Sequence, residues 1–149
     1  MTTTGSLLAG KKGLIMGVAN ERSIAWGISK AAHDQGAELA FTYQGDALKK
    51  RVEPLAASIG SSMLMECDVT NNDSLKSTFE RIEKEWGKLD FVVHAIAFSD
   101  KEELKGRYIE TSADNFAATM NVSCYSFTQV CQHAEPLMSG GGSILTLTY

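Results

Sequence analysis

Several features that mark other classes of protein are missing from the 149 residues of this chain. No apolar run approaches the roughly 20 residues that cross a bilayer, and residues 1–10 lack the basic start and apolar core of a signal peptide. The formal net charge of −4 gives no basic surface for nucleic acid. We therefore expect a cytoplasmic protein that binds neither a membrane nor a nucleic acid.

Cysteine and histidine are also scarce. The three cysteines, Cys67, Cys124 and Cys131, form no Cys-x-x-Cys pair and are odd in number, which argues against a disulfide framework and a zinc site. The three histidines show no metal-ligand spacing. We expect no bound metal, and we expect Cys124 and Cys131, which lie seven apart on one predicted helix, to be packing residues.

What the chain does contain is a regular alternation of short apolar runs and amphipathic segments. The runs predict buried strands at residues 13–16, 38–43, 62–67, 89–95 and 143–149. Helical spacing of apolar residues fills the segments between them. This alternation predicts an α/β fold, a doubly wound, Rossmann-like parallel sheet of five strands with helices on both faces. No repeat or linker divides residues 1–149, so we expect one domain.

The apolar positions of each expected helix define the face that should pack on the sheet. For the first helix they are Ile24, Ile28, Ala31 and Ala32. Pro54 should kink or restart the second helix. A connection of about 16 residues, 97–112, is long enough to suggest a functional role. One long helix should follow it, and its expected apolar side is Phe116, Met120, Ser123, Phe127, Val130, Ala134 and Leu137.

The first strand, turn and helix predict a nucleotide cradle. Gly17 permits a tight turn, and Ser23 suits the position that caps the helix. The free N–H groups of the helix would then point at an anion such as a pyrophosphate. The segment has only Gly17 and Gly27 of the G-x-G-x-x-G dinucleotide pattern, with Ala19 between them, so a plain strand–helix unit remains an equal alternative.

A ligand of a doubly wound sheet lies beyond the carboxyl ends of the strands. Asp68, at the end of the third strand, could accept a hydrogen bond from an adenine amino group while Val69 packs on the ring, although a helix-initiating aspartate is as plausible. Gln44 stands where an acidic residue would bind the ribose. Gln44 and the following Asp46 disfavour a 2′-phosphate, so the cofactor expected is NAD rather than NADP.

The ends of the fourth and fifth strands suggest the reactive half of such a site. The small residues Ala95 and Ala97, with Ile96 between them, would let a cofactor approach the backbone, although an ordinary strand end is an equal alternative. We expect His94 to be packed rather than to act as an acid. Tyr149 could donate a hydrogen bond to a substrate carbonyl, or could be a core tyrosine.

Taken together, these segments closely resemble the bacterial enoyl-acyl-carrier-protein reductases, a divergent branch of the short-chain dehydrogenase/reductase superfamily. The resemblance rests on residues 17–28, 36–44, 67–69, 94–98 and 145–149, in order and at near-family spacing. Ordinary superfamily members have a catalytic serine where this chain has Tyr149, which favours the enoyl reductases over a β-ketoacyl or alcohol reductase.

The resemblance implies reduction of a trans-2-enoyl thioester on acyl carrier protein by NADH, a step of fatty-acid elongation. It implies a catalytic and substrate-contacting Tyr149 and a substrate-contacting Ser99. The cofactor residues that it implies are Gly17, Ala19, Ser23, Ile24, Gln44, Asp68, Val69, Ala95, Ile96 and Ala97.

The family's second tyrosine and its lysine would lie beyond Tyr149. We therefore expect residues 1–149 to be a dinucleotide-binding domain that is incomplete at its carboxyl end and inactive alone, and the resemblance implies a homotetramer that buries the long helix. The alternatives are another reductase of the superfamily and a non-catalytic nucleotide-binding module.

Overall fold

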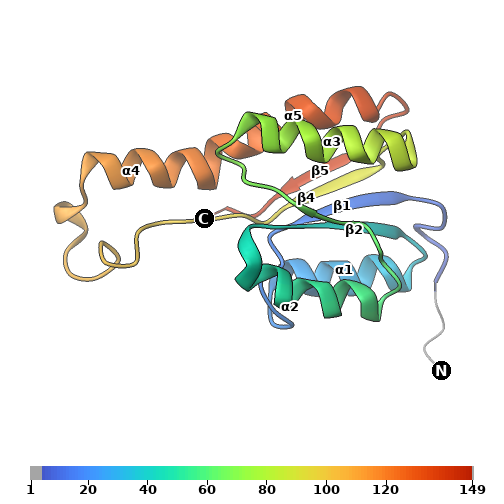
Figure 1. The fold of residues 1–149 in the computed structure, drawn as a ribbon, viewed down its shortest axis with the longest axis horizontal. Helices are drawn as coiled ribbons and strands as arrows, with labels where there is room; N and C mark the ends of the chain where they lie inside the picture. Colours follow the sequence, from blue (N-terminus) through green and yellow to red (C-terminus); the bar gives the residue numbers. More distant parts are fainter. Residues whose placement is uncertain (1–4, 149) are drawn as a thin grey trace.

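A computed structural model describes residues 5–148 of the chain. Five parallel strands form one sheet in the order β3-β2-β1-β4-β5. Figure 1 shows α1 and α2 against one face of this sheet and α3 and α5 against the other. The predicted doubly wound, Rossmann-like α/β fold is therefore confirmed.

The elements follow the predicted alternation. The strands are β1 (Lys12–Met16), β2 (Glu38–Tyr43), β3 (Leu64–Glu66), β4 (Phe91–His94) and β5 (Ser143–Thr146). The helices of the first three crossovers are α1 (Ile24–Asp34), α2 (Gly45–Ser58) and α3 (Asn72–Trp86). Between β4 and β5 lie η1 (Tyr108–Glu110), α4 (Ala113–Met120), the π-helical η2 (Asn121–Tyr125), α5 (Ser126–Ala134) and η3 (Glu135–Leu137).

Each face of the sheet has its own apolar core. One core joins β1 and β2 to α1 and α2 through fully buried side chains such as Ile15, Phe41 and Val52. The other joins the sheet to α3 and α5 through Leu14, Ile82 and Val130. Burial on both faces explains why the strands read as continuous apolar runs rather than as alternating patterns.

The predicted apolar stripe of α1 is half right. Ala32 is buried and Ile28 packs against the core, as predicted, but Ile24 is 67% exposed and Ala31 is also exposed. The remaining buried positions of α1 are Ala25, Trp26 and Ser29. Ser29 can occupy the buried face because its hydroxyl donates to the carbonyl of Ala25 at 2.7 Å. The predicted restart at Pro54 is also wrong, since α2 continues through that residue.

The predicted long helix between β4 and β5 forms as one continuous helical run over residues 113–134, because the backbone stays helical through the π-helical turn η2. The predicted buried side of this helix is wrong over its first half, since no residue of α4 is buried. Phe116 and Met120, which the sequence placed on the core side, are 52% and 44% exposed. Figure 1 shows the reason: α4 extends away from the sheet, while α5 packs on it. Only the second half of the stripe, which includes Val130, Ala134 and Leu137, enters the core.

Strand ends and cysteines bring smaller corrections. β3 and β5 are shorter than predicted, and Tyr149 lies outside the described residues. All three cysteines are free thiols; Cys67 is buried and Cys131 is half-buried, but Cys124 is exposed and is not a packing residue. None of the helices within residues 5–148 is long and apolar enough to cross a lipid bilayer.

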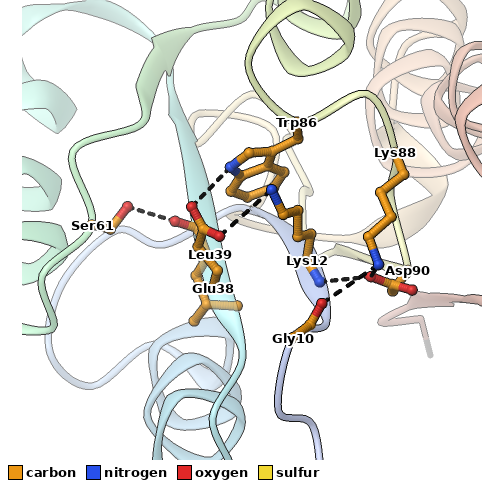
Figure 2. A network of polar contacts seen from close by, with 8 residues as sticks. All are labelled: Gly10, Lys12, Glu38, Leu39, Ser61, Trp86, Lys88 and Asp90. Atoms are coloured by element: carbon orange, nitrogen blue, oxygen red, sulfur yellow. Dashed lines mark hydrogen bonds and ion pairs between the residues drawn. The ribbon is translucent and has the colours of Figure 1, made fainter.

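A polar network secures the amino-terminal ends of β1, β2 and the segment before β4 (Figure 2). Trp86 Nε1 donates to Glu38 Oε1 at 3.0 Å, and Lys12 Nζ lies 3.7 Å from Glu38 Oε2. Asp90 accepts from the backbone N–H of Lys12 at 2.8 Å and pairs with Lys88 at 3.0 Å. Partial burial would raise the pKa of Asp90, but the Lys12 and Lys88 interactions hold that pKa below its ordinary value. These contacts tie the starts of β1 and β2 to the segment before β4.

Candidate functional site

The candidate site lies where the strand order reverses. The chain leaves β1 toward β2 and β3 on one side, then returns to pair β4 with the other side of β1. At such a switch point the connections after adjacent strands diverge to opposite faces, which opens a crevice at the carboxyl ends of the strands. A cavity of about 410 Å³ occupies this crevice, within the range of about 300 to 1,000 Å³ that ligand sites have.

Most of the predicted cofactor residues line this one cavity. They come from the ends of β1, β2, β3 and β4, and they are Gly17, Ala19, Gln44, Asp68, Val69, Ala95, Ile96 and Ala97. Ser23 and Ile24 do not line it, and neither does Ser99. The structure thus brings together four segments that the sequence could only place at four separate strand ends.

Gly17 is required by the close approach of two of these segments. Its φ of +101° lies in the region that side chains rarely adopt, and a Cβ atom there would lie 1.9 Å from the carbonyl oxygen of Ala95. Gly27 has neither constraint, because a Cβ atom built on it would meet no atom within 4 Å. Of the two glycines in the incomplete motif, only Gly17 shapes the cavity.

Ser23 acts differently from the prediction. It occupies the position before α1, but its side chain makes no capping bond to the helix. Its Oγ instead accepts from the N–H groups of Ala19 and Asn20, at 2.9 and 3.0 Å. Ser23 therefore fixes the shape of the turn from within.

The start of α1 keeps free donors near that turn. Among residues 5–148, no acceptor is recorded for the backbone N–H groups of Ile24 and Ala25. Unpaired N–H groups in the first turn of a helix, together with its dipole, favour an anion there. The Ile24 backbone, rather than its exposed side chain, thus suits a pyrophosphate.

Asp68 is oriented by its own turn. Its Oδ1 accepts from the Thr70 N–H at 2.8 Å and from the Thr70 hydroxyl at 2.7 Å, while its backbone N–H donates to Ser74 Oγ at 2.9 Å. Within the described part of the chain no donor to Oδ2 is recorded, so that oxygen can accept from a ligand. The turn reading and the ligand reading of Asp68 are therefore compatible.

Sequence reasoning missed several residues of the cavity wall. Most of them adjoin residues that were named, and they are Thr42, Tyr43, Leu48, Cys67, Thr70 and Val122. Val18 and Phe98 also line the cavity; they lie within the strand-end segments 17–23 and 95–99 that the sequence indicated, but neither was assigned a role. The order of the strand ends was signal enough to include Tyr43 or Cys67. Val122 comes from the π-helical η2, and no local sequence signal indicates it. Burial raises the pKa of Cys67, so its thiol is a neutral part of the wall.

The segment that follows β4 is held by hydrogen bonds from α4 and η2. Ser123 Oγ accepts from the Phe98 N–H at 3.0 Å and donates to the Phe98 carbonyl at 3.1 Å. Ser99 Oγ accepts from Asn115 Nδ2 at 3.2 Å and from the Thr119 hydroxyl at 3.0 Å. No group of three or more side chains that could hold a metal ion occurs among residues 5–148.

Comparison with known proteins agrees with this geometry. Residues 17–149 match a family model described as enoyl-(acyl carrier protein) reductase. The enoyl-[acyl-carrier-protein] reductase [NADH] 1 of Rhizobium meliloti is 61% identical over 149 residues, which are 100% of this chain and 55% of that protein. The chain therefore spans about half the length of this curated relative.

Two solved structures share the fold closely. An enoyl-(acyl-carrier-protein) reductase of Anaplasma phagocytophilum in complex with NAD is 58% identical with a TM-score of 0.94, covering 98% of this chain and 56% of that one. The enoyl-acyl carrier protein reductase of Bacillus cereus with NADP⁺ and indole naphthyridinone is 46% identical with a TM-score of 0.93, covering 97% and 57%. This chain belongs to the enoyl-(acyl carrier protein) reductase family.

Proposed function

We propose that the cavity at the strand ends binds NADH and that the protein carrying this chain reduces trans-2-enoyl thioesters on acyl carrier protein. The observation that carries the proposal is the single cavity at the switch point, lined by residues predicted independently from four strand ends. The names of the relatives support it, because they are NADH enoyl reductases and one solved relative holds NAD.

Different residues of the cavity would contact the adenosine half, the pyrophosphate and the nicotinamide half of a bound dinucleotide. Asp68 Oδ2 and Val69 would hold the adenine, and Gln44 would contact the adenosine side. The free N–H groups at the start of α1 would hold the pyrophosphate. Ala95, Ile96 and Ala97 would form the wall beside the nicotinamide.

The proposed reaction at the nicotinamide half needs a hydrogen-bond donor to the substrate oxygen and a wall that keeps water out. Bound NADH would supply a hydride from its C4 atom to the β carbon of the enoyl thioester. Tyr149 would donate a hydrogen bond to the thioester oxygen as negative charge develops on it, and Ser99 would contact the substrate. The enolate formed by the hydride addition would then take up one proton at its α carbon, supplied in net terms by the solvent, to give the saturated thioester. The apolar wall that includes Ile96 would hold the reacting atoms together away from water.

We further propose a cytoplasmic homotetramer. Its support is the apolar surface of residues 116–125, where Phe116, Met120 and Tyr125 are 52%, 44% and 51% exposed. The three free thiols suit the reducing conditions of the cytoplasm.

A substrate comparison tests the proposed reaction. The protein that carries this chain, expressed at the full length of its relatives, should oxidise NADH at least about a hundredfold faster with a trans-2-enoyl thioester than with a 3-oxoacyl thioester, because a cavity tuned to one transition state discriminates in kcat/KM. NADH oxidation at matched enzyme concentration is the readout. A preference for the 3-oxoacyl thioester would establish a ketoacyl reductase instead, and binding of NADH with neither reaction would establish a non-catalytic module.

A further inference from the structure

His94, the last residue of β4, is fully buried between two elements that the chain reaches much later. Its ring Nε2 lies 2.7 Å from Ser126 Oγ, at the start of α5, and its Nδ1 lies 3.0 Å from Thr146 Oγ1, at the end of β5. The ring of Phe127 packs edge-on against the imidazole at 5.6 Å. One side chain therefore links β4, β5 and the helix beside the cavity.

The neighbouring bonds define which nitrogen of His94 carries the proton. The Ser126 hydroxyl has a single hydrogen, and it donates that hydrogen to the carbonyl of Val122 at 2.6 Å. Ser126 must then accept from His94, so Nε2 carries the proton and Nδ1 accepts from the Thr146 hydroxyl. Burial lowers the pKa of His94, which keeps the ring neutral and preserves this arrangement.

The carbonyl at the end of this relay belongs to the cavity wall. Val122 lies in η2, the π-helical turn, and it lines the strand-end cavity. A hydroxyl bond to the carbonyl four residues earlier competes with regular helix hydrogen bonding and bends helices. The same turn holds the backbone of Phe98 through Ser123, so its position also affects the wall that follows Ala97.

We propose that His94 and Ser126 are positioning residues that hold the π-helical turn and Val122 against the nicotinamide half of the cavity. The relay runs from His94 Nε2–H to Ser126 Oγ, and from the Ser126 hydroxyl to the Val122 carbonyl. This inference rests on the proposed binding of NADH. It assigns to the π-helical turn a defined purpose, in keeping with the frequent occurrence of such turns at functional sites.

The chain offers a matched control for the test. Ser29 in α1 is also fully buried, and its hydroxyl also donates to the carbonyl four residues earlier, at 2.7 Å. Ser29 does not line the cavity, and within residues 5–148 its side chain hydrogen-bonds only to the Ala25 carbonyl and to no histidine. Ser126→Ala and Ser29→Ala therefore remove the same group from the same depth, and only the first interrupts the relay.

The variants should be made in the protein at the full length of its relatives, with folding checked by the unfolding midpoint. We expect Ser126→Ala to raise the dissociation constant for NADH roughly tenfold and to speed amide hydrogen exchange in residues 122–125, while Ser29→Ala changes that dissociation constant less than about twofold. His94→Leu should raise the dissociation constant for NADH as much as Ser126→Ala does. The double variant should bind NADH no more weakly than either single variant, because all three break the same relay. His94→Gln, which can still donate to Ser126, should recover most of the affinity lost by His94→Leu.

Three outcomes would contradict either the positioning role of His94 and Ser126 or the proposed function, and the measurements tell the two apart. Equal NADH affinity for Ser126→Ala and Ser29→Ala would overturn the positioning role while leaving the proposed function standing. Strictly additive effects of His94→Leu and Ser126→Ala on NADH affinity would also overturn it, since independent residues add. A parent protein that bound no NADH would overturn the proposed function, and the positioning role with it.

Discussion

Replacing Gly17 with alanine should lower the free energy of unfolding by about 3 to 5 kcal/mol. The backbone φ of +101° is strained for any side chain, and the new methyl group would lie 1.9 Å from the Ala95 carbonyl oxygen, where only backbone movement can relieve the contact. The turns after β1 and β4 would have to separate, and they form the two central walls of the cavity. The effect should appear in urea unfolding followed by the fluorescence of the buried Trp26, and NADH affinity should fall in parallel.

Gly27→Ala is the matched control for this prediction. Gly27 lies in α1 with open space around it, so alanine should raise the free energy of unfolding by about 0.5 to 1 kcal/mol through the lower helix propensity of glycine. If Gly17→Ala were as stable as the parent and bound NADH as well, the close approach of the two turns would not be essential to the site.

The second large effect concerns the choice between NADH and NADPH. We expect kcat/KM for NADH to exceed that for NADPH roughly a hundredfold, because two unfavourable charge contacts of about 1.4 kcal/mol each amount to that factor. A recess of about 540 Å³ adjoins the dinucleotide cavity, and Gln44 and Asp68 line both. Glu66 and Asp73 also line the recess, and none of the described residues that line it is basic. A 2′-phosphate on the adenosine would face these carboxylates.

The helices beside the recess add no attraction for a phosphate. Asp46 and Asp73 lie in the first turns of α2 and α3, and the Asn71 side chain accepts the N–H groups of Asp73 and Ser74. Acidic residues and a side-chain cap at these positions oppose the binding of an anion there. Lys49 is held 6.0 Å above the ring of Tyr43 and does not line the recess.

Two double variants with the same change in net charge distinguish the effect of the recess carboxylates on cofactor preference from the effect of net charge. The double variant Glu66→Gln, Asp73→Asn should narrow the preference for NADH roughly a hundredfold, since it removes two repelling charges of about 1.4 kcal/mol each. Glu80→Gln, Glu83→Gln removes two charges from α3 that do not line the recess, and it should leave the preference unchanged. Steady-state rates with the two cofactors are the measurement. A parent protein that favours NADPH would refute the role given to Gln44, Asp46 and the recess.

The order of elements and half of the residues that line the cavity could be predicted because they depend on local signals. Buried parallel strands are apolar throughout, and residues that line the cavity directly follow them, as Asp68 and Ala95 do. The phase of α1 could not be predicted in the same way. A side chain as large as Ile24 suggested burial, but the core side of the first turn is occupied by Ala25 and Trp26, which leaves Ile24 exposed. Ser29 is buried through a backbone hydrogen bond that composition does not reveal.

The segment before β5 was predicted least well for a different reason. A π-helical turn adds residues to one turn, so apolar positions before and after η2 no longer share one face. In addition, α4 extends away from the sheet (Figure 1), which leaves Phe116 and Met120 exposed, whereas Val130 and Ala134 of α5 are buried. The contact between His94 and Ser126 spans 32 residues, and only the folded chain shows it.

A crystal structure of the full-length protein grown with NADH would test the central claim most directly. We expect the dinucleotide to lie across the carboxyl ends of the strands, with the adenine against Asp68 and Val69, the pyrophosphate at the Ile24 N–H and the nicotinamide beside Ala95–Ala97. A dinucleotide bound anywhere else on the protein, or a cavity filled by the protein's own side chains at saturating NADH, would contradict it.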